Sequence, residues 1–254
     1  MNSLAINAGG LSIPVIRSGP GWLILDKPAG LSVHNEPGAD LLSLVNGFFS
    51  NRPCIAQAHD FTPEFGFHAV NRLDRSTSGL ILAACRQEVL SFLARQFESR
   101  TVKKIYRAVL HGHFLQETEQ EGGIWNFPLS PDAAGRNDPQ GGGRLLPCST
   151  RYRVLARSAH YSLAELEPLT GRMHQIRRHA AMSGHPVAGD RRYGTRRSIA
   201  FLSRNLHFER LALHAYGLTL TLPGEALPET IESDGIPADM RALFEEDAPE
   251  RGIR

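Results

Sequence analysis

The chain has 254 residues, of which 41% are hydrophobic and 21% charged, and its formal net charge is +2. Such a composition is typical of a globular protein that forms one large domain or two small ones. The N-terminus has no basic segment before its apolar residues, and no apolar run reaches about 18 residues, so we expect neither export nor a membrane span.

The cysteines give a second exclusion. Cys54, Cys85 and Cys148 lie far apart and form no C-x-x-C pair. This spacing argues against a zinc knuckle or a disulfide framework and fits a reducing cytosol, so we expect a cytoplasmic protein.

The small net charge hides an asymmetry along the chain. Residues 225–254 hold 9 acidic and 3 basic residues, whereas residues 144–210 hold 13 Arg and 4 acidic residues. Arginine, whose planar fork suits phosphates and base edges, accounts for 25 of the 28 basic residues. A basic region beside an acidic tail indicates a polyanionic partner, although solvated charged faces are also common.

The first part of the chain predicts few elements. Residues 1–20 contain several Gly and Pro and are expected to be a loosely attached lead-in. Residues 23–27 read as a strand that ends at a Pro-Ala-Gly turn, and residues 40–49 read as a short helix. A loop rich in Pro and His is expected at 51–66.

A polar block at residues 71–79 then precedes the apolar run 80–84. The block holds one carboxylate, Asp74, between Arg72 and Arg75. The apolar run predicts a buried strand and the block predicts the turn before it, so Asp74 is expected at a strand edge, where a reactive side chain can be held rigidly. The alternative is a structural Arg–Asp–Arg ion cluster that ties the loop down.

The middle of the chain adds a helix and several strands. A helix is predicted at 87–100, and strands are predicted at 105–110, 152–156 and 163–169. Residues 114–147 are predicted to form an extended irregular segment with a flexible loop at 131–144. Because strands outnumber helices and follow one another directly, the fold class is α+β with a largely antiparallel sheet.

The best helix in the sequence covers residues 173–183 and is expected to end at Gly184. Its apolar positions at i, i+3 and i+7, expected to face the core, are Met173, Ile176 and Ala180. Another face carries cations at His174, Arg177 and Arg178. A plain surface helix would show the same two stripes.

Three histidines in this region raise the possibility of a metal site. His174 and His179 are five residues apart, which places the imidazoles about 140° apart around a helix, too far to share one metal easily. No H-E-x-x-H pattern is present. We therefore expect His174, His179 and His185 to be hydrogen-bonded or to face the polyanionic partner.

Residues 71–79 (NRLDRSTSG) resemble the catalytic motif H-R-L-D-x-x-T-S-G of the RluA-type pseudouridine synthases. Four further stretches resemble motifs of that family in the same order: WLILDKPAGLSVH at 22–34, KKIYRA at 103–108, TGRMHQIRRHAAMSGHPVAGDRRYG at 170–194, and LALHAYGL at 211–218. The resemblance covers roughly residues 14–223. The chain departs from the motif at Asn71, where the family has a histidine, and we expect the amide to brace the loop instead.

The resemblance implies an α+β pseudouridine synthase fold, with a largely antiparallel mixed sheet flanked by helices around a central RNA-binding cleft. It implies an isomerase that needs no cofactor and no metal. The catalytic residues it implies are Asp74, Tyr106 and Arg177, with Arg177 paired to Asp74 and Tyr106 stacked on the base. The substrate-binding residues it implies are Arg72, Arg172, His174 and Arg178. The basic surface is also expected to include Arg191, Arg192, Arg196 and Arg197.

The expected organisation is a lead-in at 1–20, a catalytic domain at 21–224, and an acidic tail at 225–254 with a packed helix at about 236–246. An additional N-terminal RNA-binding domain, found in many family members, is expected to be absent because only about 20 residues precede the first motif.

The expected partner is structured RNA rather than DNA or a membrane, and the expected state is a monomer. Short similarities favour tRNA over rRNA: residues 177–179, residues 93–99, and residues 207–208 ahead of 211–215. Alternatives are a 23S rRNA pseudouridine synthase, a non-catalytic RNA-binding protein of the same fold and, least favoured because acidic residues are sparse, a metal-dependent nuclease.

Overall fold

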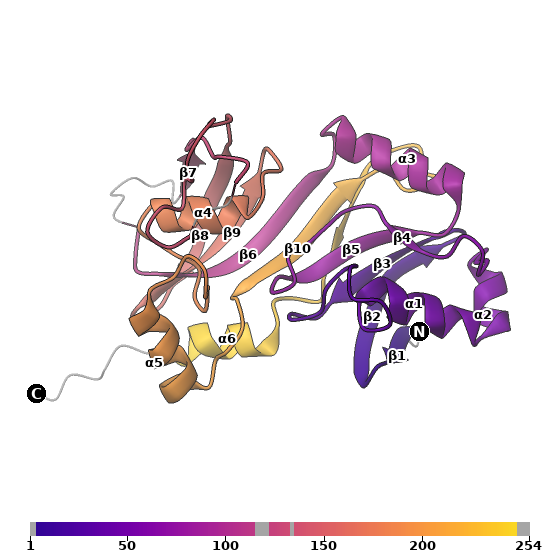
Figure 1. Cartoon of the computed structure of the whole chain (residues 1–254), viewed down its shortest axis with the longest axis horizontal. Helices are drawn as coiled ribbons and strands as arrows, with labels where there is room; N and C mark the ends of the chain where they lie inside the picture. Colours follow the sequence, from indigo (N-terminus) through magenta and orange to yellow (C-terminus); the bar gives the residue numbers. More distant parts are fainter. Residues whose placement is uncertain (1–3, 115–121, 133–134, 248–254) are drawn as a thin grey trace, which may run out of the picture. The chain divides into compact units, whose positions relative to one another are not determined.

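A computed structural model describes residues 4–114, 122–132 and 135–247 (Figure 1). The chain divides into two compact units. The first comprises the residues up to Lys103 together with Ala215–Asp234, and the second comprises Lys104–His214 together with the residues from Gly235 onward. The sequence shows no boundary within 21–224, because each unit is assembled from two separate segments of the chain.

The first unit is built on a sheet with strand order β1-β2-β3-β5-β10, in which β4 pairs with β5 and β11 with β10. The strands are β1 (Ala5–Ala8), β2 (Leu11–Gly19), β3 (Trp22–Lys27), β4 (His68–Ala69), β5 (Ser78–Ala84), β10 (Leu213–Leu220, in this unit from Ala215) and β11 (Glu229–Glu232). Its helices are α1 (Leu41–Ser50), α2 (Pro53–Ala58) and α3 (Gln87–Glu98).

Successive side chains of β3 and β5 point to opposite faces of this sheet, and a helix packs against each face. Leu25 pairs with Ile81 in antiparallel register, and both belong to a core cluster that includes Val45 of α1. The next pair, Ile24 and Leu82, belongs to a second cluster that includes Leu93 of α3. Since successive side chains of a strand point to opposite faces, β3 and β5 are buried on both sides.

The second unit has strand order β6-β9-β8-β7, and the registers described for its pairs are antiparallel. Its strands are β6 (Lys103–His111, in this unit from Lys104), β7 (Gly122–Trp125), β8 (Thr150–Arg157) and β9 (Tyr161–Pro168). Its helices are α4 (Gln175–Met182), α5 (Arg196–Leu206) and α6 (Ala238–Glu245). In Figure 1, α4 lies across β8 and β9, and its Ile176 and Ala180 join a core cluster with Ala164 of β9.

The structure confirms the α+β class and most central elements. Elements of the predicted type lie at or around residues 23–27, 40–49, 80–84, 87–100, 105–110, 152–156 and 163–169. The helix predicted at 236–246 is α6, packed through buried Met240 and Leu243. The rest of the acidic tail, residues 248–254, is outside the described residues.

Three local predictions are wrong. Residues 5–19 of the expected lead-in form β1 and β2, because their alternating pattern buries Ile6 and Ile13 against α1. The loop expected at 51–66 contains α2, which begins at Pro53, a residue preorganised for a first helical turn. Met173 does not face the core: α4 begins only at Gln175, and Met173 is 49% exposed.

The segment predicted to be irregular at 114–147 is more ordered than expected. It contains β7, a bridge between Leu129 and Leu146, and a backbone hydrogen bond from Ser130 to the carbonyl of Gln140. Residues 115–121, and residues 133–134 of the predicted flexible loop, are outside the described residues.

Candidate active site

Asp74 lies in the first unit at the start of a tight turn that leads into β5. The amide of Thr77 donates to the carbonyl oxygen of Asp74 (3.0 Å), and β5 follows at Ser78. The motif glycine, Gly79, has φ +112°, and a side chain there would collide with the carbonyl oxygen of Ala215. Asp74 is half-buried and Arg72 is exposed. The strand edge predicted for Asp74 is therefore confirmed.

Asn71 braces this turn against β5. Its side-chain nitrogen donates to the carbonyl of Leu80 (3.3 Å), and its side-chain oxygen accepts from the amide of Leu82 (2.8 Å). A side-chain amide supplies both a donor and an acceptor, which is what the carbonyl of Leu80 and the amide of Leu82 require. The bracing role predicted for Asn71 is confirmed.

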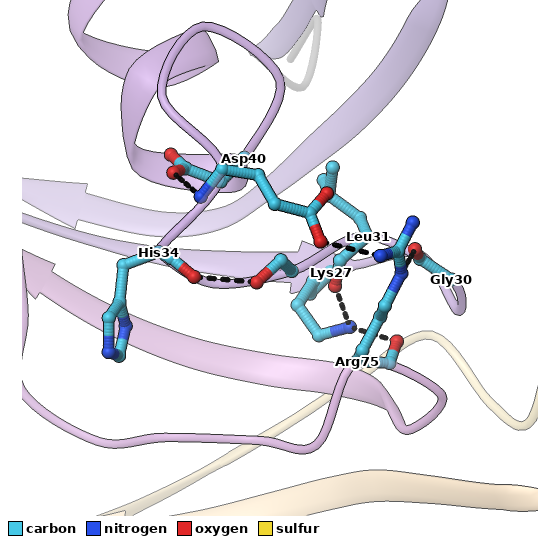
Figure 2. Close-up of polar contacts among 8 residues, drawn as sticks. Lys27, Gly30, Leu31, His34, Asp40 and Arg75 are labelled. Carbon is cyan, nitrogen blue, oxygen red and sulfur yellow. Dashed lines mark hydrogen bonds and ion pairs between the residues drawn. The ribbon is translucent and has the colours of Figure 1, made fainter.

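Lys27 holds the turn from the other side. Its ammonium group donates to the carbonyls of Pro28 (2.9 Å), Leu31 (2.8 Å) and Arg75 (3.2 Å), and the residue is fully buried. Figure 2 shows this group between the carbonyls of Leu31 and Arg75. The amide of Gly30 also donates to the Arg75 carbonyl (2.8 Å). Lys27 thus positions the residue directly after Asp74.

Arg75 ties the same loop down through its side chain. Its Nε donates to the carbonyl of Gly30 (2.8 Å), and its guanidinium pairs with Glu36 at 2.5 Å (Figure 2). A half-exposed pair of this kind contributes little stability by itself. The two contacts of Arg75 fix positions instead, because they link the segment at residues 27–36 to the block that carries Asp74. Arg75 therefore ties the loop down, as the structural alternative expects, but through Glu36 and Gly30.

The second unit holds Tyr106, Arg172, His174, Arg177 and Arg178. Tyr106 lies on β6, opposite Leu166 of β9, and is half-buried beside the core of this unit. Arg172 and His174 precede α4, and Arg177 and Arg178 lie in its first turn.

Arg177 is buried and forms a bidentate ion pair with Asp190. Its Nε donates to one carboxylate oxygen (2.7 Å) and its terminal nitrogen to the other (2.9 Å). The amides of Arg192 and Tyr193 also donate to Asp190. Burial acts to raise the pKa of Asp190, but the Arg177 guanidinium and these amides hold it below its ordinary value. The expected pairing of Arg177 with Asp74 stays a prediction.

His174 sits at the N-cap of α4 in a left-handed conformation, with φ 52° and ψ 27°. Its Nδ1 is 2.9 Å from the hydroxyl of Tyr193. A non-glycine residue in this region carries strain, and such strain is concentrated at functional sites. The hydrogen bond and the strained backbone together fix the direction of the imidazole.

The turn before α4 is organised by Gln175, which is buried. Its side-chain oxygen accepts from the hydroxyl of Thr170 (2.8 Å) and from the amide of Arg172 (3.0 Å). Arg172 is half-buried, and its Nε is buried with no hydrogen-bond partner in the described part of the chain. An unsatisfied buried donor on a cation is suited to an anionic ligand.

Arg178 has a different place from the predicted one. It is fully buried, and its guanidinium donates to the backbone carbonyls of Ser130 (2.9 Å), Met173 (3.3 Å), Pro139 (2.6 Å) and Gln140 (2.5 Å). Burial lowers the pKa of this guanidinium. Helix α4 starts two residues later than predicted, and its Arg178 side chain points into the protein. In this structure Arg178 fastens Ser130, Pro139 and Gln140 to α4 and is not accessible to a substrate.

The three histidines of this region make hydrogen bonds within the protein. His179 is fully buried between the hydroxyl of Thr150 and the carbonyl of Phe127 (both 2.9 Å), and burial lowers its pKa. His185 lies 2.9 Å from the carbonyl of His111. Within the described ranges, no group of three or more His, Cys, Asp or Glu side chains is placed to hold a metal ion.

Sequence reasoning did not select Lys27, Gln175 and Asp190 as site residues. All three lie inside the quoted motifs, and each is a polar residue that the fold buries. Asp190 could have been selected from the sequence, because it is one of only 4 acidic residues among the arginines of residues 144–210. A lone acid in such a region is a strong candidate for a buried arginine partner.

Residues 21–182 match the family model described as RNA pseudouridylate synthase. The match covers more than half of the chain and includes the Asp74 turn and α4. This chain belongs to that family. The RluA-type resemblance of its motifs is thereby confirmed, and the departure at Asn71 is a variation within the family.

Two curated relatives of this pseudouridylate synthase family member differ in their named RNA. Ribosomal large subunit pseudouridine synthase C of Vibrio cholerae serotype O1 is 36% identical over 205 residues, which cover 79% of this chain and 59% of the relative. tRNA pseudouridine synthase C of Salmonella typhimurium is 34% identical over 242 residues, which cover 87% and 85%. The chain spans about three fifths of the length of the first curated relatives that it matches.

A solved structure gives the same fold. Human RNA Pseudouridylate Synthase Domain Containing 4 aligns with a TM-score of 0.70 over 89% of this chain and 90% of the human chain, at 21% identity. At that identity the likeness concerns the fold alone.

In the described part of the chain, no helix is both long and apolar enough to cross a membrane.

Proposed function

We propose that this protein is an RNA pseudouridine synthase that isomerises a specific uridine of a structured RNA. The observation that carries the proposal is the Asp74 turn: the backbone on either side of the carboxylate of the matched family motif is braced, by the bonds of Asn71 to β5 and by the bond of Lys27 to the carbonyl of Arg75. A turn braced twice places one carboxylate reproducibly, which is what a nucleophile requires.

The reaction breaks the bond between N1 of uracil and C1′ of the ribose, turns the base, and joins C5 to C1′. The proton of C5 leaves and N1 ends protonated, so atoms and electrons balance without a cofactor. Asp74 would act at C1′, as a nucleophile or as an electrostatic partner of the sugar. The target nucleotide must leave its stack, which costs a few kcal/mol.

The other candidate residues take supporting roles in this proposal. Arg177 would keep Asp74 ionised, Tyr106 would stack on the uracil and assist the removal of the C5 proton, and Arg72 would occupy the space left by the flipped base. Arg172 and His174 would bind the substrate. The buried, unpartnered Nε of Arg172 supports a phosphate contact at that position.

We favour tRNA as the substrate. Support comes from the match to tRNA pseudouridine synthase C along 85% of that relative's length. The named function of the Vibrio relatives makes 23S rRNA the alternative. A monomeric state and a cytoplasmic location stay predictions.

The test is release of tritium from RNA labelled at C5 of uridine, with tRNA transcripts and 23S rRNA stem-loops compared under single-turnover conditions. We expect one uridine of a tRNA to react fastest. Faster reaction of an rRNA stem-loop would overturn the choice of substrate, and no release from any RNA would favour a non-catalytic RNA-binding protein.

A further inference from the structure

Helix α5 (Arg196–Leu206) is attached to the second unit through few side chains. Thr195 caps its start by accepting from the amide of Ser198 (3.1 Å), and His207 ends it in a left-handed conformation. Leu202 is the one residue of this helix that is buried, and it joins the core of the unit. Most of the helix surface is therefore open to a partner.

The exposed surface carries an aromatic ring between two cations. Arg197, Phe201 and Arg204 stand at i, i+4 and i+7, so they share one side of the helix. Phe201 is 51% exposed. Along the axis, Phe201 is about 6 Å from Arg197 and about 4.5 Å from Arg204.

The segment around this side of the helix is rich in positive charge, and the carboxylate of Glu209 lies on another side of α5, where it accepts from the hydroxyl of Ser203 (3.1 Å). Residues 191–208 contain five arginines and no Asp or Glu. In the described part of the chain, Arg196, Arg197 and Arg204 are exposed and form no ion pair, whereas Arg151 and Arg153 on β8 pair with Glu167 and Glu165. Arginines without carboxylate partners around an exposed ring favour a polyanion with a stackable base over an apolar protein surface.

We propose that α5 is an RNA-docking surface on which an unpaired base stacks against Phe201, while Arg197 and Arg204 contact the neighbouring phosphates. The proposal rests on the proposed function only for the identity of the RNA. It adds a recognition site outside the residues assigned to the reaction, and it requires an unpaired nucleotide in the substrate besides the target uridine.

Three variants separate the stacking from the charge. Phe201→Ala removes the ring, Phe201→Trp keeps one, and the double change Arg197→Gln with Arg204→Gln removes both cations. The matched control is Ile124→Ala, because Ile124 is also exposed (49%) and lies on β7 of the same unit. Two affinities are measured: the Kd for the tRNA transcript that serves as substrate, at several salt concentrations, and the Kd for a fully paired duplex RNA. The third measurement is the single-turnover rate at saturating RNA.

We expect Phe201→Ala to weaken binding of the tRNA between about 5-fold and 150-fold, the range of one base stack. Phe201→Trp should restore the affinity, and its added fluorescence should be quenched by RNA, since Trp22 and Trp125 are buried. The double variant should reduce the salt slope of log Kd by about 1.4, from two phosphate contacts in a single strand. The rate at saturating RNA should not change.

Parent-like affinity of Phe201→Ala would overturn the inference, and so would an equal loss of affinity for the paired duplex. Self-association of the parent that Phe201→Ala abolishes, with RNA affinity unchanged, would assign α5 to a protein contact and also overturn it. If the parent modifies no RNA while binding still depends on Phe201, the proposed function fails and the docking surface stands.

Discussion

Lys27 donates hydrogen bonds to three backbone carbonyls, and one of them belongs to Arg75, the neighbour of Asp74. Lys27→Met keeps the chain length of the side chain and removes these bonds. We expect the free energy of unfolding to fall by about 2 kcal/mol or more, the worth of one buried bond to a charged group, and turnover to fall more than RNA affinity. Thermal melts and single-turnover assays measure the two effects.

Lys103 is an exposed lysine of the same unit and provides the control for stability. Lys103→Met should change the free energy of unfolding by no more than about 0.5 kcal/mol. Equal melting and equal turnover of Lys27→Met and parent would show that Lys27 does not position the Asp74 turn.

At the scale of elements, α4 buries a cation that the sequence places on a cationic face. The helix starts at Gln175 instead of Met173, so Met173 is exposed. Within the helix, Arg178 donates to the carbonyls of Ser130, Pro139 and Gln140. Arg136 extends this fastening by donating to the carbonyls of Arg191 and Gly194. The loop at 135–147 is therefore held both to α4 and to the loop that carries Asp190.

Arg178→Met should release that loop, because a thioether cannot donate to its carbonyls. We expect trypsin to cleave after Arg136 or Arg144 at least about ten times faster than in the parent, which corresponds to about 1.4 kcal/mol of local opening. The control is Arg153→Met, on an exposed strand position paired with Glu165. Cleavage at the parental rate would mean that the loop is held by other contacts.

For the whole molecule, the buried histidines set the expected response to pH. Burial, with the positive charges of Arg210 and Arg107, lowers the pKa of His214 to about 3, and burial also lowers the pKa of His179 and His111. These bases bind protons in the unfolded chain below about pH 6.5 but not in the folded one. Lowering the pH from about 6.5 toward 3 therefore favours unfolding.

We expect the free energy of unfolding to fall by about 1.4 kcal/mol per pH unit from His214 alone once the pH is well below 6.5. The low pKa of Asp190 adds stability that is present above about pH 4 and is lost below it. Denaturant titrations between pH 7.5 and 4.5 measure the slope. A flat profile across this range would contradict the assignment of these histidines as neutral in the folded protein.

The central strands and helices could be predicted from the sequence because one pattern determines each of them. The apolar run at 80–84 predicts β5, and the amphipathic spacing at 87–100 predicts α3. The two units could not be predicted, because they depend on which strands pair far apart along the chain. The motif block predicted the edge position of Asp74, whereas the bonds of Lys27 and Arg178 to backbone carbonyls depend on loops that no side-chain periodicity describes.

The assignment of Asp74 as the reacting carboxylate is tested most directly by Asp74→Asn, which preserves shape and removes the charge. The measurement is tritium release from a C5-labelled tRNA transcript in a single turnover, together with the Kd for the same RNA and a thermal melt. The account predicts loss of release by at least about 10⁴-fold, with the Kd and the melting temperature close to those of the parent. Appreciable release by Asp74→Asn, in a protein that folds and binds RNA like the parent, would contradict it.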